Sequence, residues 1–340
     1  MRRIGFSEAI DDSLGQAMAI DPRIILLGED VQGLHGGLFM RFGRERVRNT
    51  PISEAAFLGA AVAAAMAGLR PVAEVMLVDF IGVAVDALLN HAAKLEVFSG
   101  GRWKAPLVVR TACGGGYGDG GQHEQSLWGW LAHIPGLSVI VPSCPADAGG
   151  LMQTALELGS PVVFLEHKLI SSLWLDFLGS GGRDTVSYDV PAQGRRGLAP
   201  RVWRALPMGT AAVRREGTDL TMVTLGVGVH RALEAAVVLE GRGISAGVLD
   251  LRSVFPLDKA AICREVGRTR RLLVVDEDYE GFGLSGELAA VALEAGLTFQ
   301  YARVCTPGTI PYARHLEEAA LPNVERILRA CRQLLESRSD

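Results

Sequence analysis

The stretch SEAAFLGAAVAAAMAGLRPVAEVML, residues 53–77, joins an alanine-rich apolar segment to a short run rich in valine. Residues 55–69 contain no charged side chain, which is typical of a helix that is covered on most of its surface. The run RPVAEVML (70–77) that follows is nearly continuous in apolar residues and has the length of one strand. A helix that leads directly into a buried strand predicts an α/β unit with a parallel sheet.

The same alternation extends on both sides of this stretch. Helical patterns occur over 7–20, where Ser7 is placed to cap the helix, and over 85–98. Further strand patterns are RIILLG (23–28), APLVVRTA (105–112), LSVIVPS (137–143) and SPVVFLEH (160–167). After residue 206 the alternation starts again. The predicted fold class is therefore α/β, with two domains that contain mainly parallel sheets.

A change of composition separates the two domains. Residues 176–201 are rich in Gly, Pro, Ser and Arg and have no sustained apolar period, although their aromatic residues predict some docked structure. We predict an N-terminal domain over 1–175, a linker or insertion over 176–206, and a C-terminal domain over 207–340.

Charge and hydropathy limit the classes of function. The chain has 340 residues, with 34 Lys and Arg against 38 Asp and Glu, so no basic footprint indicates nucleic acid or an anionic membrane. The uncharged run over 55–69 is shorter than the roughly 20 residues that span a bilayer, and the N-terminus has no apolar signal core. We predict a cytoplasmic protein that binds small molecules and other proteins. Because 49% of its residues are hydrophobic, part of the apolar surface is expected to lie against another subunit.

The five cysteines are widely spaced, with no Cys-x-x-Cys pair and no nearby pair of histidines. Buried or inert thiols are expected, rather than a metal site.

Two glycine-rich segments invite a cofactor interpretation. GFGLSG (281–286) satisfies G-x-G-x-x-G, but DEDYE separates it from the preceding strand pattern and the next strand offers Arg303 instead of an acid. A loop followed by a helix start is the better interpretation. CGGGYGDGGQHEQS (113–126) contains the Gly-Asp-Gly that begins the Mg²⁺-diphosphate motif of thiamine enzymes. That motif also needs a later Asn as a metal ligand, and the chain has no Asn between Asn90 and Asn323. A diphosphate cofactor would therefore have to be held by another chain.

Glu54 is the one acid at the start of the apolar helix pattern, behind Ser53, which can cap that helix. The ordinary interpretation is a surface acid favoured by the helix dipole. The functional interpretation is a carboxylate in an apolar pocket that shares a proton with a partner such as a pyrimidine ring nitrogen.

His123 lies in a glycine-flanked loop after the 105–112 strand pattern, at the end where open α/β sheets place their ligands. Taken alone, a loop histidine is more often a satisfied polar residue than a catalyst. His133 and His167 are weaker candidates on the same argument.

Several longer motifs carry a family resemblance. They include LLGEDV (26–31), FGRERVRNTPISE (42–54), AAKLEVFSGG (92–101), GGQHEQS (120–126), LDLRSVFPLD (249–258) and RLLVVDED (271–278). On these motifs the chain resembles the beta subunit of the thiamine-diphosphate-dependent decarboxylating component of 2-oxo acid dehydrogenase complexes. The family includes pyruvate, branched-chain and acetoin types and belongs to the transketolase-like superfamily.

The resemblance implies a pyrimidine-binding domain followed by a transketolase C-terminal-like domain. It implies an alpha subunit that supplies the diphosphate and Mg²⁺ site, an α2β2 heterotetramer, and in many members a lipoyl-bearing acyltransferase core. The implied reaction is oxidative decarboxylation of a 2-oxo acid with acyl transfer to lipoamide.

The resemblance also assigns roles to single residues. Glu54 matches the glutamate that hydrogen-bonds the pyrimidine ring nitrogen and so activates the aminopyrimidine. Phe80 matches an aromatic residue against that ring, to which Phe57 would add, and His123 matches a histidine near the substrate or the incoming lipoyl arm. Family members often bind K⁺ through backbone carbonyls, which here would be those of Leu107, Ala155, Leu156, Leu158 and Ser160.

The chain departs from the family in three places: the segment over 31–42 is shorter, the linker is longer, and Glu124 follows His123 where Ser is common. A carboxylate there is expected to raise the pKa of the neighbouring histidine. Two alternatives stay open. One is an acyloin-forming or acyl-transferring thiamine enzyme subunit with a non-lipoyl acceptor, and the other is a non-catalytic assembly subunit.

Overall fold

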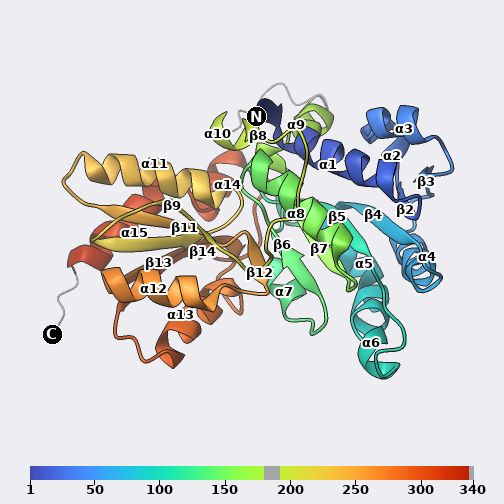
Figure 1. The fold of residues 1–340 in the computed structure, drawn as a ribbon. Coiled ribbons are helices and arrows are strands. Elements are labelled where there is room, and N and C mark those ends of the chain that lie inside the picture. The colour runs from blue at the N-terminus through green and yellow to red at the C-terminus, as the bar shows by residue number, and fades with distance from the viewer. Residues whose placement is uncertain (180–191, 337–340) are drawn as a thin grey trace.

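The computed structural model describes residues 1–179 and 192–336. The chain forms two α/β domains that lie side by side, with helices on both faces of each main sheet (Figure 1). The predicted α/β class with mainly parallel sheets is confirmed.

The N-terminal domain contains a seven-stranded sheet. Its strands are β2 (Ile24–Gly28), β3 (Val47–Asn49), β4 (Arg70–Leu77), β5 (Val108–Cys113), β6 (Ser138–Ile140), β7 (Val162–His167) and β12 (Ser253–Phe255). Their order across the sheet is β12-β6-β7-β5-β4-β2-β3, and β12 alone is antiparallel to its neighbour. The five strand patterns therefore became strands β2, β4, β5, β6 and β7, because each run is largely buried on both faces of the sheet.

Helices cover both faces of this sheet. They are α1 (Phe6–Ile20), α2 (Val31–Leu34), α3 (Gly36–Phe42), α4 (Glu54–Met66), α5 (Ile81–Asp86), α6 (Leu95–Phe98), α7 (Trp128–Ala132), α8 (Pro145–Glu157) and α9 (Ser172–Gly179). Short turns of other helix types are η1 (Val78–Phe80), η2 (Ala87–Ala92), η3 (Gly120–Gln122) and η4 (Lys168–Ile170). Helices α1 and α8 pack against each other on one face, while α4 and α5 belong to the core on the other.

The C-terminal domain contains a five-stranded sheet. Its elements are β9 (Ala212–Arg215), β10 (Leu220–Thr224), α11 (Gly228–Glu240), β11 (Ala246–Asp250), α12 (Lys259–Thr269), β13 (Arg271–Tyr279), α13 (Leu284–Glu294), β14 (Gln300–Thr306), α14 (Arg314–Ala320) and α15 (Val324–Glu336). The strand order is β14-β13-β10-β11-β9, with only β9 antiparallel to its neighbour.

The described part of the predicted linker is docked on the N-terminal domain. After α10 (Ala192–Arg195), strand β8 (Arg196–Ala199) pairs antiparallel with β1 (Arg2–Gly5), and Trp203 is buried. The rest of the linker, residues 180–191, lies outside the described residues. The boundaries at 175 and 206 stay a prediction.

Three local expectations were wrong. Ser7 does not cap the first helix, because α1 begins one residue earlier, behind Gly5, and the Ser7 hydroxyl instead lies 2.9 Å from the Ser172 hydroxyl. Ser53 occupies the N-cap position of α4, but its side chain makes no capping hydrogen bond. The helix expected over 85–98 is divided, because the six-residue π-helical turn η2 separates α5 from α6.

The short 31–42 segment closes over a buried group of charges. His35 lies between α2 and α3, with its Nδ1 2.9 Å from the Asp11 carboxylate and its Nε2 3.3 Å from the Glu74 carboxylate. Burial alone would lower the pKa of His35, but the two carboxylates raise it to about 10, so the ring carries a positive charge. The segment is thus anchored on the sheet.

Candidate active site

Glu54 stands at the first position of α4, as the sequence predicts. Its side chain is half-buried, and its carboxylate has no hydrogen-bond or ion-pair partner among the residues that the structure describes. A second acid, Glu29, lies close by, and its pKa is raised by burial and by the negative charges of Asp30 and Glu54. The start of α4 is therefore an acidic position whose carboxylate is available to a group from outside the chain.

The surface beside Glu54 is apolar and uncovered. Helix α4 buries Phe57 and Leu58 but leaves Ala56 and Ala60 exposed, and Ile52 just before the helix is 74% exposed. Other large apolar side chains of this domain are also exposed: Val83, Val97, Phe98 and Trp103. Several large apolar side chains exposed in one domain are typical of a surface that contacts another protein.

Phe80 and His123 are brought together by the sheet. Phe80 ends the turn η1 after β4, and His123 follows the turn η3 in the loop after β5, the strand next to β4. Their ring centroids are 5.5 Å apart and the rings meet edge to face at 86°. Because carboxyl ends of neighbouring parallel strands meet at one edge, the sequence positions of the two residues already favoured this contact.

Helix α4 carries Glu54 and Phe57, and these two residues differ in how they contact the region of Phe80 and His123. Glu54 makes no polar contact with either ring in the described part of the chain, but α4 packs against α5, which begins directly after Phe80. Phe57 is 5% exposed and belongs to the main core, against which Phe80 also packs. The position of Phe57 is thus explained by packing, and its contact with a cofactor stays a prediction.

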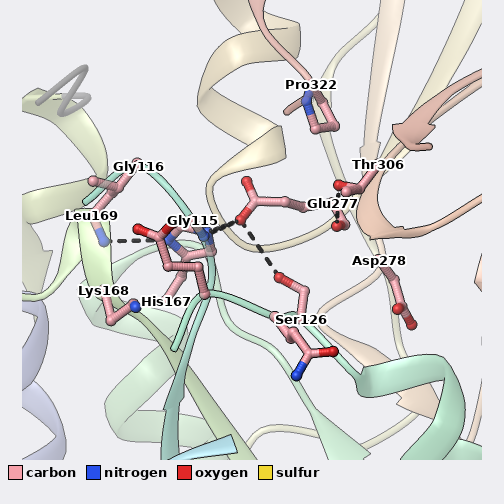
Figure 2. A network of polar contacts seen from close by, with 12 residues as sticks. Gly115, Gly116, Ser126, His167, Lys168, Leu169, Glu277, Asp278, Thr306 and Pro322 are labelled. Carbon is pink, nitrogen blue, oxygen red and sulfur yellow. Dashed lines mark hydrogen bonds and ion pairs between the residues drawn. The ribbon is translucent and has the colours of Figure 1, made fainter. Parts of the chain in front are cut away.

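The glycine loop that precedes His123 is held by carboxylates, as Figure 2 shows for part of the network. Five backbone N–H groups between residues 115 and 120 each donate to a Glu side chain. The pairs are Gly115 with Glu277 (2.8 Å), Gly116 and Gly118 with Glu317 (2.6 and 3.2 Å), and Tyr117 and Gly120 with Glu124 (2.6 and 3.1 Å). Glu277 and Glu317 come from the C-terminal domain, so the second domain fixes a loop of the first.

This arrangement decides what the Gly-Asp-Gly can do. A diphosphate would need the free N–H groups of such a loop, and here those groups already donate to protein carboxylates. The loop of this chain is therefore not a diphosphate cradle, in line with the lack of the downstream Asn.

Glu277 is the centre of the contact between the domains. One of its oxygens lies 2.9 Å from His167 Nε2, and the other accepts a hydrogen bond from Arg231 at 2.8 Å. Burial alone would raise the pKa of Glu277, but His167 and Arg231 hold it at about 2. Gly114 makes room for this contact, because with φ of +95° a Cβ there would lie 2.1 Å from His167 Nε2.

Lys168 holds the backbone of His123. Its ammonium is fully buried, donates to the carbonyl oxygen of His123, and lies 4.9 Å from the centre of the Tyr117 ring. Burial lowers the pKa of Lys168, although nearby Glu124 opposes this.

The Glu124 carboxylate binds the backbone of the loop. It is buried inside the loop, on the N–H groups of Tyr117 and Gly120, and no interaction joins it to the His123 ring within residues 1–179 and 192–336. Burial, together with the negative charge of Glu317, raises the pKa of Glu124 to about 8 against the opposing effect of Lys168.

Two of the five predicted potassium ligands already accept hydrogen bonds. The Leu107 carbonyl accepts from the Val162 N–H at 2.9 Å, and the Leu156 carbonyl accepts from the Arg70 guanidinium. The potassium site stays a prediction, and the Arg70 contact weighs against it because that cation occupies the oxygen.

Other cofactor positions are accounted for by local structure. The GFGLSG segment forms a loop with Gly283 as the N-cap of α13, and Arg303 donates to the Glu280 carbonyl in that loop. The five cysteines are free, and Cys113, Cys305 and Cys331 are buried. In the described ranges no group of three or more His, Cys, Asp or Glu is placed to hold a metal ion. Nor does any helix there have the length and apolar character needed to cross a membrane.

Sequence reasoning missed the residues that fix the loop. Glu277, Glu317 and Lys168 were not singled out, and His167 was weighed only as a weak catalyst. One signal was present, since the acids of VVDED directly follow a buried strand pattern, where charged side chains need partners.

Comparisons with known proteins agree with this architecture. A model of the transketolase pyrimidine-binding domain matches residues 2–171, and one of the transketolase C-terminal domain matches residues 209–327. Among solved structures, a protein described as "Split gene transketolase, inactive beta4 tetramer" has a TM-score of 0.76 over 98% of both chains at 22% identity. That likeness concerns the fold alone.

Curated relatives extend the match to whole chains. "Acetoin:2,6-dichlorophenolindophenol oxidoreductase subunit beta" of Bacillus subtilis (strain 168) is 38% identical over 98% of both chains. "2-oxoisovalerate dehydrogenase subunit beta" of the same organism is 38% identical over 99% of this chain and 100% of its own. "Pyruvate dehydrogenase E1 component subunit beta-2, mitochondrial" of Oryza sativa subsp. japonica is 38% identical over 96% of this chain and 85% of its own. The chain therefore belongs to the transketolase-type family of 2-oxo acid dehydrogenase beta subunits.

Proposed function

We propose that this chain is the catalytic beta subunit of a thiamine-diphosphate-dependent enzyme that oxidatively decarboxylates a 2-oxo acid and transfers the acyl group to lipoamide. The observation that supports this most directly is Glu54, a carboxylate with no partner among the described residues at the edge of an exposed apolar face. Its environment suits a proton shared with a ring nitrogen.

The residues present fit the pyrimidine half of the cofactor and not its diphosphate half. Glu54 offers an acceptor with no partner among the described residues and Phe80 a half-buried ring, whereas five N–H groups of the glycine loop already donate to protein carboxylates. An alpha subunit would therefore hold the diphosphate and its Mg²⁺, as the missing Asn also suggests.

Each residue then has a definite task. Glu54 holds and releases a proton at the pyrimidine nitrogen, and the apolar surface around it excludes water that would compete for that proton. Phe80 packs against the pyrimidine ring, and His123 orients the substrate or transfers protons beside it. Bound thiamine diphosphate supplies a carbon nucleophile and an electron sink.

The proposed assembly is an α2β2 heterotetramer in the cytoplasm, with a lipoyl-bearing acyltransferase core as a further partner. The uncovered face of α4 supports an obligate neighbour, since monomeric proteins seldom expose such surfaces. Potassium is the least supported component, because Arg70 already binds the Leu156 carbonyl.

A second candidate is an acyloin-forming or acyl-transferring thiamine enzyme subunit with a non-lipoyl acceptor. It is supported by the acetoin relative, whose name gives dichlorophenolindophenol and not lipoamide as the acceptor and whose 38% identity equals that of the 2-oxoisovalerate relative. The assembly-subunit alternative has less support, because Glu54 and His123 are both present.

The test is reconstitution. The chain is co-purified with its alpha-type partner from the native host, and turnover is measured with a panel of 2-oxo acids and with acetoin. Lipoamide and dichlorophenolindophenol serve as alternative acceptors, each with and without thiamine diphosphate. We expect thiamine-dependent CO₂ release from a 2-oxo acid with acyl-lipoamide as product. With an aldehyde added as a further acceptor, thiamine-dependent activity in the absence of lipoamide would favour the second candidate, and no thiamine-dependent turnover in an intact heteromer would refute both.

A further inference from the structure

The Phe80–His123 contact is built from two loops that are far apart in the sequence. One loop continues from β4 and the other from β5 through the glycine segment, so nothing local fixes the distance between the two rings. Contacts made by other residues must therefore fix the position of one ring relative to the other.

The residues next to the two rings join the loops. Asp79 directly precedes Phe80, and Gln125 lies two positions after His123. The Gln125 side-chain amide donates to Asp79 Oδ1 at 2.8 Å, and the Gln125 backbone N–H lies 3.4 Å from the same oxygen. A carboxylate that accepts from one residue in two ways fixes both the backbone and the side chain of that residue.

The second domain completes this link. The hydroxyl of Tyr279, at the end of β13, lies 2.9 Å from Gln125 Oε1. Because the Asp79 carboxylate can only accept, the amide nitrogen must face Asp79, and this turns the amide oxygen toward the Tyr279 hydroxyl; a flipped amide would lose its bond to Asp79. Tyr279 thus holds the Gln125 side chain in the position that joins the two loops.

Tyr279 is itself firmly placed. The two aspartates among the three acids before it contact the segment that follows Gln125. Asp278 accepts from the Gly129 N–H at 2.8 Å, and Asp276 accepts from the Trp128 indole N–H at 2.9 Å. The end of β13 therefore reaches the pyrimidine-binding domain as a rigid edge and not as a mobile loop.

We propose that Tyr279, Gln125 and Asp79 form a positioning chain across the two domains that sets the contact between Phe80 and His123 and thereby the geometry of the reaction. None of the three is assigned a contact with substrate or cofactor. The inference rests on the proposed function, because it gives the Phe80–His123 pair a catalytic use.

The sharpest variant is Tyr279→Phe, which removes one hydroxyl and keeps the ring. Its matched control is Tyr301→Phe, which removes another C-terminal-domain hydroxyl with one hydrogen bond, to the Ser285 carbonyl at 3.0 Å. Asp79→Ala removes the acceptor for Gln125, whereas Asp79→Asn retains an acceptor oxygen and serves as the rescue variant. All are measured as holoenzymes with the alpha-type partner.

We expect Tyr279→Phe to lower kcat about three- to tenfold with little change in KM, since one hydrogen bond that orients a reacting group is lost. Asp79→Ala is expected to lose more, and Asp79→Asn to return to within about twofold of the wild type. Tyr301→Phe should leave kcat unchanged. Equal kcat values for Tyr279→Phe and Tyr301→Phe, or no rescue by Asp79→Asn, would overturn the proposal.

A readout independent of turnover separates this inference from the proposed function. In histidine-labelled protein, the His123 ring signal, identified by its loss in His123→Gln, reports the nearby Phe80 ring. Tyr279→Phe should move that signal and Tyr301→Phe should not. An unmoved signal refutes the positioning chain even in an inactive preparation, whereas a moved signal with no thiamine-dependent turnover of the wild type refutes only the proposed function.

Discussion

The start of α4 and the loop that carries His123 belong to the same candidate site, and they are built in opposite ways. At the start of α4, Glu54 has no polar partner among the described residues and its neighbours are exposed alanines. In the loop, successive N–H groups donate to carboxylates, two of which come from the other domain.

The difference follows from what each half must do. A carboxylate that exchanges a proton with a bound ring must stay free of competing donors in its own chain. A loop that orients a reacting group must be fixed before the substrate arrives, because misplacement is costly. The chain therefore completes one half of the site by itself and leaves the other half to be covered.

The largest effect is expected from Glu54→Gln, which keeps the shape but removes the proton acceptor. Turnover of the reconstituted holoenzyme should fall at least about 100-fold, within the range for loss of an acid–base group. The free energy of unfolding of the isolated chain should change by less than about 0.5 kcal/mol, because the carboxylate has no partner to lose. Steady-state kinetics and urea titration measure the two quantities.

The control for this variant is Glu45→Gln, since the Glu45 side chain is 81% exposed and lies outside the site. If Glu54→Gln leaves turnover unchanged, Glu54 has no catalytic role and is an ordinary acid at the start of a helix.

A smaller effect, on stability, is expected from Glu277→Gln on the fixed side of the comparison. Removing this buried charge leaves Arg231 without its anion and changes the hydrogen-bond partner of His167, which should cost about 3 kcal/mol in the free energy of unfolding. Glu280→Gln at the exposed Arg303 pair should cost less than about 1 kcal/mol. Urea midpoints measured side by side test the difference.

The pH dependence of Glu277→Gln has a definite sign. The pKa of Glu277 is held at about 2, below its ordinary value of 4.5, so its stabilisation is present above about pH 4.5 and is lost as the pH falls toward 2. The difference in free energy of unfolding between the wild type and the variant should therefore become smaller as the pH falls. A difference in free energy of unfolding that stays constant down to pH 3 would contradict the buried ion pair.

The last effect, on stability, is expected from Glu124→Gln and is confined to the higher pH range. Because the pKa of Glu124 is raised from 4.5 to about 8, the folded chain binds a proton that the unfolded chain releases, and stability falls as the pH rises through that window. Glutamine resembles the protonated acid, so the variant should match the wild type near pH 4, below the ordinary pKa of Glu124, and exceed its melting temperature near pH 8.5. Glu318→Gln, on the exposed side of α14, is the control. Parallel melting curves for Glu124→Gln and the wild type across this range would show that Glu124 is not protonated in the loop.

Much of the fold was predictable because its signals are local. Strands such as β4 and β7 are buried on both faces and therefore appear as apolar runs, and the meeting of Phe80 with His123 follows from the pairing of β4 with β5. The three-residue strand β12 was missed, since its pairing with β6 joins segments more than 100 residues apart and leaves no periodic pattern.

The loop that carries His123 was less predictable from the sequence than the start of α4. Glu54 stands out in the sequence because its surroundings are apolar, whereas Glu317 and Glu277 become significant only when folding brings them to Gly116 and Gly115. The direction of Glu124 was also hidden, because neighbouring loop residues can point to opposite sides and no period decides which.

Strand β12 has a consequence for the modularity of this molecule. It belongs by sequence to the second domain, yet it pairs along the outer edge of the first domain's sheet, against β6. A fragment cut at the junction near residue 206 would lose that strand and leave the edge of β6 open to pair with other chains. The two domains therefore cannot be exchanged between relatives as independent units. A chimera keeps this edge closed only if β12 and β6 are inherited together.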